Sequence, residues 1–469
     1  MNKEKSSNYD VIIVGAGPAG IFSALELIKE TPDDFKILML DSGNDIRTRI
    51  EKRKSGNKNE IMQGWGGAGA FSDGKLTLTA DIGGYLSEFL TLGTLERFIT
   101  EVEKMYVEFG TSKDRLVTGE GEDVHEIRKN ALKYGITLIP YRLLHIGTDR
   151  CAEVLKAMYD SIITSSKVTI HFNETAKTVI LENKKLAGIK TNHGEYKGKI
   201  VILATGRSGA AWMHKESLRL GLSLESNPVD IGVRVEVPAE ICSHLTDILY
   251  EFKVRFYSPT FEQECRTFCV CPKGEVTKEI VYDPDTNEKW VTVNGHSYSN
   301  QETNNTNFAL LVSSKFTEPF NDPLAYGRSV SKLANLLTGG QTVIIQRLAD
   351  LKRGRRSTSK RIKKSSIEPT FKEAIPGDIS FVLPYRHLQS ILEMLEALDQ
   401  IMPGVNSSNT LLYAVETKYY SNKIKVTDNL ETEIPGLYAI GDGAGVTRSL
   451  VQASVSGLLA GRSIKSIKK

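Results

Sequence analysis

A strand followed by a glycine-rich turn and a helix opens the chain, and this feature constrains the fold most strongly. Val11 to Val14 form a continuous apolar run, which is typical of a strand buried on both faces. Gly15, Gly17 and Gly20 follow with the spacing G-x-G-x-x-G, and apolar residues at helical spacing come next. In such a turn the first glycine permits a tight bend, the second lets a pyrophosphate approach, and the third allows close packing of helix and strand. The helix N-terminus then presents N–H groups and its positive dipole end to the phosphates.

The next strand of the unit carries an acid where a nucleotide ribose would lie. Lys36 to Leu40 is predicted to be a second buried strand, and Asp41 stands at its end, 21 positions after Gly20. An acid there accepts hydrogen bonds from ribose hydroxyls and repels a 2′-phosphate. The alternative is a chance glycine turn in a βαβ unit that binds no nucleotide, but all the parts occur in register. We therefore predict a dinucleotide bound by Gly15, Gly17, Pro18, Ala19, Gly20, Asp41 and Ser42.

Length and charge bound the class of protein. The 469 residues exceed one typical domain, so two domains are expected. Lys and Arg number 60 against 57 Asp and Glu, and this near balance gives no global field for nucleic acid or a membrane surface. Five cysteines are sparse and odd in number, which favours a reducing compartment over a disulfide framework. With no signal peptide or bilayer-spanning run in the sequence, we expect a cytoplasmic protein without a membrane partner or a metal.

A second glycine-rich stretch runs from Met62 to Leu76. It repeats the G-x-G-x-x-G spacing, but no buried strand precedes it, so a second Rossmann turn is not predicted. Many glycines with few bulky side chains suggest backbone lying flat against a large planar ligand. The alternative is a flexible surface loop, but the large apolar side chains of Trp65, Phe71 and Leu76 disfavour it. Candidate ligand contacts are Gly66, Gly67, Ala68, Ser72, Asp73 and Gly74.

The chain between this stretch and residue 206 is predicted to complete the first domain. Helical apolar spacing occurs in 86–109, 122–134 and 149–165, the last with Asp149 as a plausible cap. Short apolar stretches at 168–172, 176–181 and 185–191, separated by polar turns, indicate a three-stranded β-meander. A buried strand from Lys199 then ends in the small-residue turn Ala204-Thr205-Gly206.

Residues 227–424 have a different texture. Several alternating runs predict an antiparallel sheet that forms one wall of a substrate pocket, with strands expected at 231–237, 252–257, 267–271, 290–293 and 308–312 and helices at 323–337 and 388–401.

The last segment returns to the first domain. Ile434 to Gly445 is predicted to be a strand running into a glycine-rich turn around Asp442, and a long helix follows from Thr447 to Ile467. The predicted fold class is therefore α/β: a Rossmann-type cofactor domain with a parallel sheet and a β-meander, plus a second, largely antiparallel-sheet substrate domain. The predicted domains are 1–226 with 425–469, including a helical insertion at about 45–140, and 227–424.

The combined motifs resemble the flavoprotein superfamily of glutathione reductase type. This resemblance implies FAD as the cofactor, contacted also by Ala204, Thr205, Gly206, Gly441, Asp442, Gly443, Thr447 and Arg448. A carboxylate at Asp442 would accept hydrogen bonds from ribityl hydroxyls, although a simple helix cap is the alternative for this residue. The helix beginning near Thr447 would point its positive end at the flavin edge that gains negative charge on reduction.

More narrowly, the chain resembles a bacterial family of FAD-dependent dehydrogenases. The residues that carry this resemblance are Gly66–Lys75, Thr267–Val276, Val293–Tyr298 and Tyr438–Arg448. The similarity extends over nearly the whole chain. It implies an oxidoreductase but does not indicate the substrate.

Candidates for proton transfer lie in the predicted sheet domain. His296, expected in a turn between Gly295 and Ser297, is the first candidate because an imidazole titrates near neutral pH. A solvated turn histidine is the alternative. Tyr298 is a candidate for orienting a substrate, as are Tyr419 and Tyr420, with packing in a pocket wall as the alternative for each tyrosine.

Three cysteines, Cys265, Cys269 and Cys271, lie close together in the sequence. Cys269 and Cys271 are expected on one face of a strand, which is poor geometry for a disulfide between them. A redox pair of Cys265 with either of the others remains possible, but small buried side chains are favoured. The spacing does not fit a four-thiolate metal site.

Three functional interpretations remain open. The first is an FAD-dependent oxidoreductase acting on a small molecule; because only one strand–glycine–helix unit occurs, electrons would come from the substrate, a protein carrier or transiently bound NAD(P)H. The second is a flavin-dependent RNA-modifying enzyme, suggested by eight cationic residues in 352–364. No interleaved aromatic residues accompany them, so a solvated loop is favoured and nucleic acid is an unfavoured partner. The third is a non-catalytic flavin-binding or sensing protein.

Overall fold

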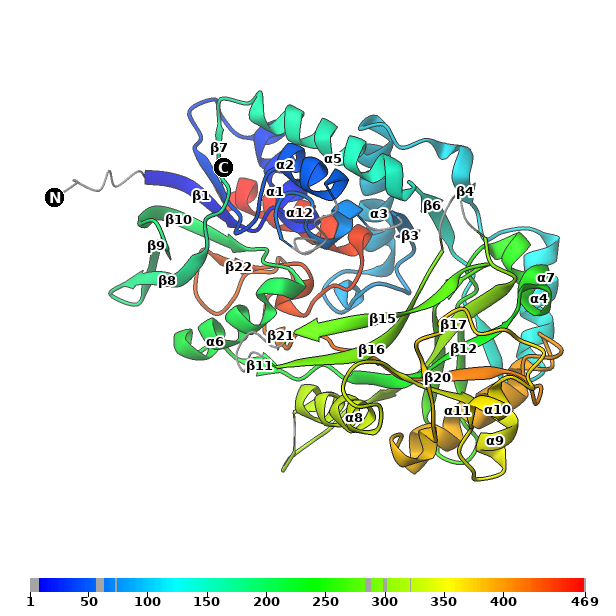
Figure 1. The fold of residues 1–469 in the computed structure, drawn as a ribbon. Helices are drawn as coiled ribbons and strands as arrows, with labels where there is room; N and C mark the ends of the chain where they lie inside the picture. The colour runs from blue at the N-terminus through cyan, green and yellow to red at the C-terminus, as the bar shows by residue number, and fades with distance from the viewer. Residues whose placement is uncertain are drawn as a thin grey trace. The chain divides into compact units, whose positions relative to one another are not determined.

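The computed structural model describes residues 8–55, 63–71, 74–282, 288–297, 302–320 and 322–467 (Figure 1). The chain forms two compact units. Unit 1 comprises Met1–Leu116, Arg142–Asn227 and Tyr420–Lys469, and unit 2 comprises Val117–Tyr141 and Pro228–Tyr419. Residues 117–141, which the domain prediction placed in the first domain, therefore lie in unit 2.

A mainly parallel sheet forms the centre of unit 1. Strand β1 (Asn8–Val14) pairs in parallel with β2 (Ile37–Leu40) and β10 (Glu195–Leu203). On the outer sides, β7 (Val168–His171) pairs in parallel with β2, and β22 (Leu437–Ala439) pairs in parallel with β10. The second half of β1 is fully buried, as its apolar run requires. The fold class predicted from the sequence, a Rossmann-type α/β unit with a second, largely antiparallel unit, is confirmed.

The β-meander of unit 1 differs in membership from the prediction. It consists of β8 (Ala176–Glu182), β9 (Lys185–Thr191) and the start of β10, all antiparallel. Residues 168–172 were expected to be its first strand, but β7 is instead the parallel edge strand beside β2. The error has a physical reason: a short apolar run between polar turns shows that a strand forms, but not which neighbour it pairs with.

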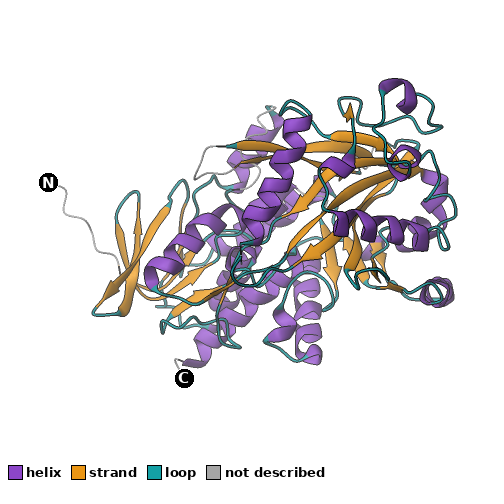
Figure 2. Ribbon diagram, turned by 90° about the horizontal axis from the view of Figure 1, so that it is seen from below, coloured by secondary structure: helices purple, strands orange, loops and turns teal. Residues whose placement is uncertain are grey.

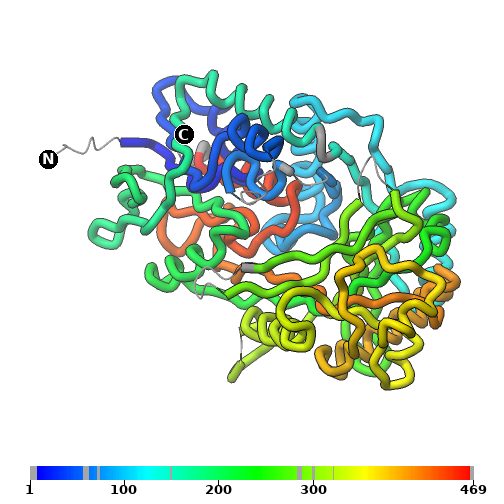
Figure 3. Tube along the Cα trace, in the orientation of Figure 1, coloured from blue at the N-terminus to red at the C-terminus, as the bar shows by residue number. Residues whose placement is uncertain are grey.

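The first and last helices of the described chain pack against each other in unit 1. Helix α1 (Pro18–Glu30) lies along α12 (Leu450–Ile467), and Figure 3 shows this contact between the blue and red ends of the chain. Close approach depends on Gly457, because a Cβ atom there would clash with the carbonyl oxygen of Ala19. The Ser23 hydroxyl also donates a hydrogen bond of 3.1 Å to the Gly457 carbonyl.

Further helices of unit 1 are α2 (Ile46–Lys54), α3 (Leu92–Glu108), α5 (Thr148–Ile163) and α6 (Ala210–Leu220). The N-cap of α5 is Gly147, so the prediction that Asp149 caps this helix is wrong. Helix α12 begins at Leu450, three residues later than predicted. Within the described residues, no helix is both long and apolar enough to cross a bilayer.

Unit 2 is built on an eight-stranded, largely antiparallel sheet, drawn in orange in Figure 2. Its order is β19-β18-β20-β12-β17-β14-β13-β5. The strands are β5 (Ile136–Leu138), β12 (Val229–Pro238), β13 (Val254–Tyr257), β14 (Glu264–Cys271), β17 (Asn305–Ser314), β18 (Ile344–Arg347), β19 (Ile375–Pro376) and β20 (Leu411–Lys418). A separate hairpin pairs β15 (Glu275–Tyr282) with β16 (Lys289–His296).

The unit 2 sheet has one apolar and one polar face. Alternate residues of β12 and β17, including Val233, Val235 and Leu310, enter an apolar core together with α7 (Ala239–Leu249) and α11 (Tyr385–Leu398). The intervening residues of β12 include Asp230, Arg234 and Glu236, all at most 1% exposed. Helix α8 (Pro323–Leu337) has the bounds expected from the sequence.

Candidate functional site

The first glycine turn of unit 1 leaves open space at one position only. Gly15, with φ +112°, closes against Ala204, and a Cβ atom at Gly20 would clash with the Gly15 carbonyl oxygen. Gly17 is different, because a Cβ atom there would have no neighbour within 4 Å. No side chain caps the N-terminus of α1, which begins at Pro18. The turn therefore combines two packing glycines with one glycine that faces open space beside an uncapped helix end, as an approaching phosphate requires.

Asp41 connects the two glycine-rich segments. Its carboxylate accepts hydrogen bonds of 2.8 Å from the backbone N–H groups of Ala16, Gly43 and Gly64. The predicted contact with a ribose stays a prediction, since a carboxylate offers about four acceptor positions. Sequence reasoning did not reveal that the Asp41 carboxylate also holds the second glycine-rich segment, because this contact joins Asp41 to Gly64, 23 residues away. Ser42 follows Asp41 and is exposed.

The second glycine-rich segment is anchored rather than flexible. Trp65 is fully buried, and its indole N–H donates to the Leu155 carbonyl at 2.8 Å. The guanidinium of Arg49, 2% exposed, donates to the carbonyls of Trp65 and Gly67 at 2.5 and 3.1 Å. A Cβ atom at Gly67 would lie 3.4 Å from the Gly17 Cα atom. The segment therefore lies directly beside the first glycine turn.

The remaining predicted contacts of this segment are placed as follows. Gly66 donates its N–H to the Ala16 carbonyl at 2.8 Å, and Ala68 lies in the short 3-10 helix Gly67–Phe71. Gly74 packs against α5 and the chain before it, because a Cβ atom there would lie 2.8 Å from the Ile146 Cβ atom. Ser72 and Asp73 lie outside the described residues.

Two further turns meet the first one at the same edge of the sheet. Strand β10 leads into Ala204, whose N–H donates to the Val14 carbonyl at 2.8 Å. Gly206, with φ +60°, has open space around it, as Gly17 does. A Cβ atom at Gly443 would lie 2.7 Å from the Gly206 carbonyl oxygen, and one at Gly441 would lie 3.0 Å from the Ala19 Cβ atom. The turns near residues 17, 206 and 442 are therefore mutual neighbours, although they are far apart in the sequence.

Asp442 is held from within the same turn. Its Oδ1 atom accepts a hydrogen bond from the Thr447 hydroxyl at 2.7 Å, and Oδ2 lies 3.9 Å from the Arg207 Nε atom. Burial raises the pKa of Asp442, while Arg207 and Thr447 oppose that shift. Asp442 begins the 3-10 helix Asp442–Ala444 and does not cap α12.

Arg448 lies between two aromatic rings just before α12. Its Cζ atom is 3.5 Å from the ring centroid of Tyr420 and 4.4 Å from that of Tyr85. Its buried Nε and Nη2 atoms have no hydrogen-bond partner among the described residues. Burial lowers the pKa of Arg448 to about 10, so the side chain stays charged at neutral pH. A confined cation with unused donors is suited to an anionic or carbonyl-bearing ligand.

The residues of unit 1 fit a flavin nucleotide. Gly17 and Gly206 leave room where a ligand backbone could approach, and α1 provides an uncapped N-terminus. The Thr205 hydroxyl and two guanidinium nitrogens of Arg448 are buried without a hydrogen-bond partner within the described chain. Four segments predicted separately from the sequence thus converge on one edge of the sheet.

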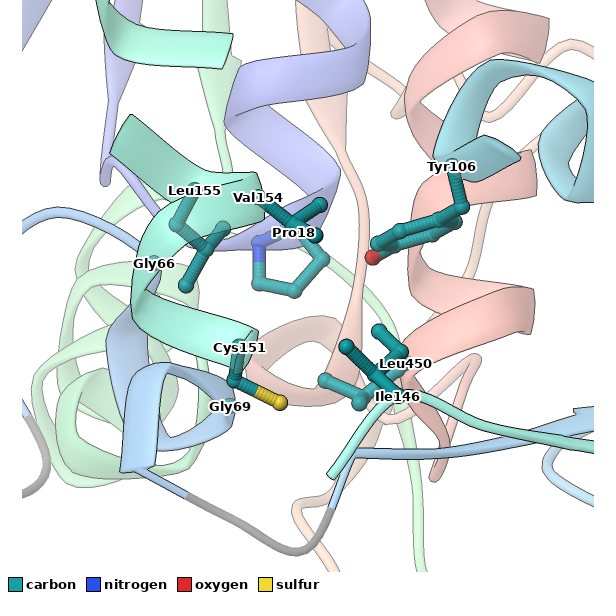
Figure 4. Close-up of a pocket in the computed structure, with 9 residues that line it drawn as sticks. All are labelled: Pro18, Gly66, Gly69, Tyr106, Ile146, Cys151, Val154, Leu155 and Leu450. Atoms are coloured by element: carbon teal, nitrogen blue, oxygen red, sulfur yellow. The ribbon is translucent and has the colours of Figure 1, made fainter. Parts of the chain in front are cut away.

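A small apolar cavity lies next to this edge (Figure 4). Its volume is about 20 Å³, which accommodates roughly one water molecule and no flavin ring. Its lining includes Pro18 of α1, Gly66 and Gly69 of the second glycine-rich segment, and Leu450 of α12. The Tyr106 ring closes one side of the cavity. Burial raises the pKa of the Tyr106 hydroxyl to about 12, so it stays protonated.

Unit 2 carries a buried charge network on its polar sheet face. Arg234 and Glu416 are both fully buried and form a two-pronged ion pair, with N–O distances of 2.7 and 2.8 Å. Lys418 lies 3.1 Å from Glu416. Burial raises the pKa of Glu416, but Arg234 and Lys418 outweigh that effect and hold it below its usual value. Sequence reasoning missed this pair because its members lie on β12 and β20, 182 residues apart.

Three of the residues predicted to transfer a proton or orient a substrate lie in the described part of the chain. His296 is the exposed last residue of β16, paired with Glu275 of β15, so the prediction that it lies in a turn is wrong. Its proposed role in proton transfer stays a prediction. Tyr298 lies outside the described residues. Tyr419 hydrogen-bonds the Ser331 hydroxyl at 2.9 Å in unit 2, and Tyr420 stacks on Arg448 in unit 1.

Several cations of the predicted basic stretch are already paired. Arg355 and Arg361 lie 2.9 and 3.9 Å from the buried carboxylate of Asp350, and Lys352 lies 3.4 Å from Glu396. Part of the stretch forms the short helix α10 (Ser359–Ile362). The stretch is therefore not a single solvated loop, and part of its charge supports local structure.

A wider pocket of about 670 Å³ lies in unit 2. Ser314 and His387 line it and hydrogen-bond through Oγ and Nε2 at 3.0 Å. Burial, and to a lesser extent Arg386, lowers the pKa of His387 to about 4, so the imidazole is neutral at pH 7. Its Nδ1 atom has no partner among the described residues, so no acid orients it as in a catalytic triad. No cluster of three or more His, Cys, Asp or Glu side chains in the described chain could hold a metal ion.

Comparisons with known proteins extend over both units. The solved structures that this chain matches include L-proline dehydrogenase from P. horikoshii (12% identity, 99% of this chain and 95% of that chain, TM-score 0.43) and glycine oxidase from Geobacillus kaustophilus (14%, 98% and 95%, TM-score 0.38). A third is L-amino acid deaminase from Proteus myxofaciens (12%, 100% and 92%, TM-score 0.37). An uncharacterized protein of Clostridium beijerinckii is 25% identical over 473 residues, covering 95% of this chain and 79% of that protein.

A family match concerns unit 2 directly. The matched residues, 228–419, coincide with the long segment of unit 2. The family's description names FAD dependence, so FAD, predicted from the motifs of unit 1, is confirmed as the cofactor. The finer assignment to the glutathione reductase-type superfamily stays a prediction. Residues 228–419 match the family "FAD-dependent protein, C-terminal domain-like".

Proposed function

We propose that this chain is an FAD-dependent oxidoreductase that exchanges electrons with a small-molecule substrate. The observation that supports this most is the convergence of four glycine-containing segments at one sheet edge of unit 1. The turns at Gly17 and Gly206 leave open space, and Arg448, three residues after the Gly441–Gly445 turn, has buried hydrogen-bond donors without a partner among the described residues. The match of residues 228–419 to an FAD-dependent family supports the same cofactor independently of these motifs.

The residues of unit 1 have distinct tasks in this proposal. Bound flavin supplies the capacity to accept and donate electrons. Gly17 and the N-terminus of α1 accommodate phosphate, and the free acceptor capacity of Asp41 serves a ribose. Asp442, whose Oδ1 is already occupied by Thr447, offers Oδ2 to a hydroxyl donor.

Arg448 balances negative charge in this proposal. The side chain remains protonated at neutral pH, and its position beside the first turn of α12 adds a fixed positive charge to the helix dipole. Stacking between Tyr85 and Tyr420 holds the guanidinium in place without neutralising it. A preorganised cation of this kind stabilises charge that develops during reaction, because no solvent has to reorient.

Proton transfer is assigned to unit 2. His296 is exposed at the end of β16. We propose His296 as the proton donor or acceptor and Tyr298 as an orienting hydroxyl. Among the described residues, only the turn at Gly15–Gly20 has the G-x-G-x-x-G spacing between a strand and a helix, which favours electrons from the substrate itself, a protein carrier or transiently bound NAD(P)H.

The proposal is tested by spectroscopy on the purified full-length chain. We expect a yellow protein that releases FAD on denaturation. Under anaerobic conditions, NADH, NADPH and fractionated metabolites are screened for bleaching of the flavin absorbance. A protein that neither contains nor takes up FAD would overturn the cofactor assignment. A bound flavin that even dithionite fails to reduce would overturn the oxidoreductase and leave a binding protein.

A further inference from the structure

Strand β14 contains a local irregularity at two of the three neighbouring cysteines. From Cys265 to Phe268, β14 pairs with β17 residue by residue, but the next pairing joins Cys271 to Asn307 rather than to the residue expected. Between these two pairings the chain advances three residues on β14 but only two on β17, which defines a β-bulge. Cys269 lies in the bulge with φ +46°, a left-handed conformation uncommon for a residue with a side chain. The chain is folded tightly between the two thiols.

The bulge brings two thiols into contact. The Sγ atoms of Cys269 and Cys271 are 3.9 Å apart. Cys269 is half-buried, whereas Cys271 is 2% exposed. The expectation of poor disulfide geometry assumed a regular strand, and the bulge removes that assumption. A disulfide of about 2.05 Å requires the sulfurs to move closer by roughly 2 Å, within the reach of side-chain rotation and a small backbone adjustment.

A buried arginine holds this arrangement from the neighbouring strands. The Nη1 atom of Arg234 donates to the Cys269 carbonyl at 3.2 Å and to Asn307 Oδ1 at 2.8 Å. The same atom lies 4.0 Å from the Cys271 sulfur. Glu416 fixes the other side of the guanidinium. Arg234 thus holds the backbone of the bulge, and its guanidinium lies beside the Cys271 sulfur.

We propose that Cys269 and Cys271 form a reversible dithiol–disulfide pair, a redox-modification site separate from the proposed flavin chemistry. The oxidant is a low-molecular-weight disulfide such as oxidised glutathione. The Cys269 thiolate attacks one sulfur of the oxidant, forms a mixed disulfide and releases one thiolate. Cys271 then loses its proton and attacks the Cys269 sulfur, which forms the Cys269–Cys271 bond and releases the second thiol. The protein loses two hydrogens, and one oxidised glutathione becomes two reduced molecules.

Cys265 is a matched internal control for this site. It lies on the same strand, but its side chain is fully buried in the apolar core of unit 2. Burial raises the pKa of its thiol well above the usual value, with weaker opposing contributions from Arg266. Proximity in sequence alone therefore does not make a reactive thiol in this strand.

The experiment uses the full-length, FAD-loaded protein equilibrated in glutathione buffers of increasing oxidised fraction. Samples are quenched with acid, alkylated and digested with trypsin. Cleavage after Arg266 and Lys273 places Cys269 and Cys271 together in the peptide 267–273 and leaves Cys265 in the preceding peptide. We expect the 267–273 peptide to change from two alkyl groups to none, with the mass loss of two hydrogens, while Cys265 stays alkylated throughout.

Three variants separate the steps. Cys271→Ser should retain glutathione on Cys269, because the resolving thiol is absent, and Cys269→Ser should leave Cys271 fully alkylated. Cys265→Ser should give the same oxidation midpoint as the unmodified chain. Two alkylated thiols in the 267–273 peptide at every buffer ratio would overturn the proposal, as would glutathione retained on Cys269 in the unmodified chain. The peptide map of the unmodified chain decides the question even where a variant fails to fold.

Discussion

The cofactor edge of unit 1 and the polar sheet face of unit 2 use different parts of the polypeptide. At the edge of unit 1, backbone turns create the space, and Gly17 and Gly206 matter because they lack side chains. On the face of unit 2, the central feature is a side-chain network in which Arg234 and Glu416 are both fully buried. The residues that form the cofactor edge of unit 1 therefore lie in short local sequence motifs. The network of unit 2 depends on which strands pair, and short motifs do not contain that information.

The largest effect is expected from breaking the network of unit 2. Arg234→Met removes the partner of a buried carboxylate and should lower the free energy of unfolding by about 3–5 kcal/mol. Urea unfolding followed by circular dichroism measures this change. The double variant Arg234→Met with Glu416→Gln should recover a substantial part, because no uncompensated charge remains. A single variant as stable as the unmodified chain would show that unit 2 does not depend on this pair.

A smaller effect, on binding rather than stability, is expected at the backbone turn of unit 1. Gly17 has an extended backbone (φ −80°, ψ −177°) and open surroundings, so Gly17→Val should fold while filling the space left for phosphate. We expect FAD affinity to fall by about 100-fold or more, equivalent to ~2.7 kcal/mol. Fluorescence titration of the apoprotein measures it. Gly93→Val, at an exposed glycine of α3 that also has open surroundings, is the matched control and should bind FAD normally.

The buried imidazole of His387, which lines the wider pocket of unit 2, should make the stability of the protein depend on pH. The folded pKa of His387, about 4, lies below its usual value of 6.5, so the unfolded chain binds the proton more readily. The buried, neutral imidazole therefore contributes fully to the free energy of unfolding above pH 6.5. This contribution is lost as the pH falls toward 4, and the loss is about 2 kcal/mol between pH 7 and pH 5. In His387→Gln the loss of unfolding free energy over that interval should be smaller by this amount. Equal pH profiles for both proteins would contradict the burial of a neutral imidazole.

The smallest effect tests Arg448, the cationic side chain that the proposal for unit 1 places beside α12. Arg448→Gln removes the cation beside α12 and should lower the flavin reduction potential by roughly 30 mV, about 1.4 kcal/mol for a two-electron couple. Equilibrium reduction against a reference dye measures the shift. The surface variant Arg47→Gln in the same unit should leave the potential unchanged. An unchanged potential in Arg448→Gln would confine the residue to a packing role between its two tyrosines.

Local sequence patterns predicted much of unit 1. The run Val11–Val14, the glycine spacing and Asp41 predicted β1, the turn, α1 and β2, because each part is specified by neighbouring residues. Local patterns also predicted a helix at 323–337 in unit 2, and α8 has these bounds. They did not show that the Asp41 carboxylate also braces the second glycine segment.

Features that depend on distant partners were not predictable in this way. Strand β7 was assigned to the meander because its pairing with β2 leaves no trace in its own residues. Segment 117–141 belongs to unit 2 because β5 pairs with β13, more than 100 residues later in the chain. The contact between Cys269 and Cys271 depends on a one-residue bulge, which the pattern of a regular strand does not predict.

The packing of α12 on α1 has a consequence for how the protein is made. The first glycine turn emerges from the ribosome about 430 residues before Leu450, at the start of the helix that completes its surroundings. At roughly 5–20 residues per second, translation separates the two segments by about 20 to 90 s. During this interval the nascent chain lacks the Gly441–Gly445 turn and Arg448. We therefore expect FAD to bind only after α12 has been synthesised, and we expect a chain truncated before α12 to hold no flavin.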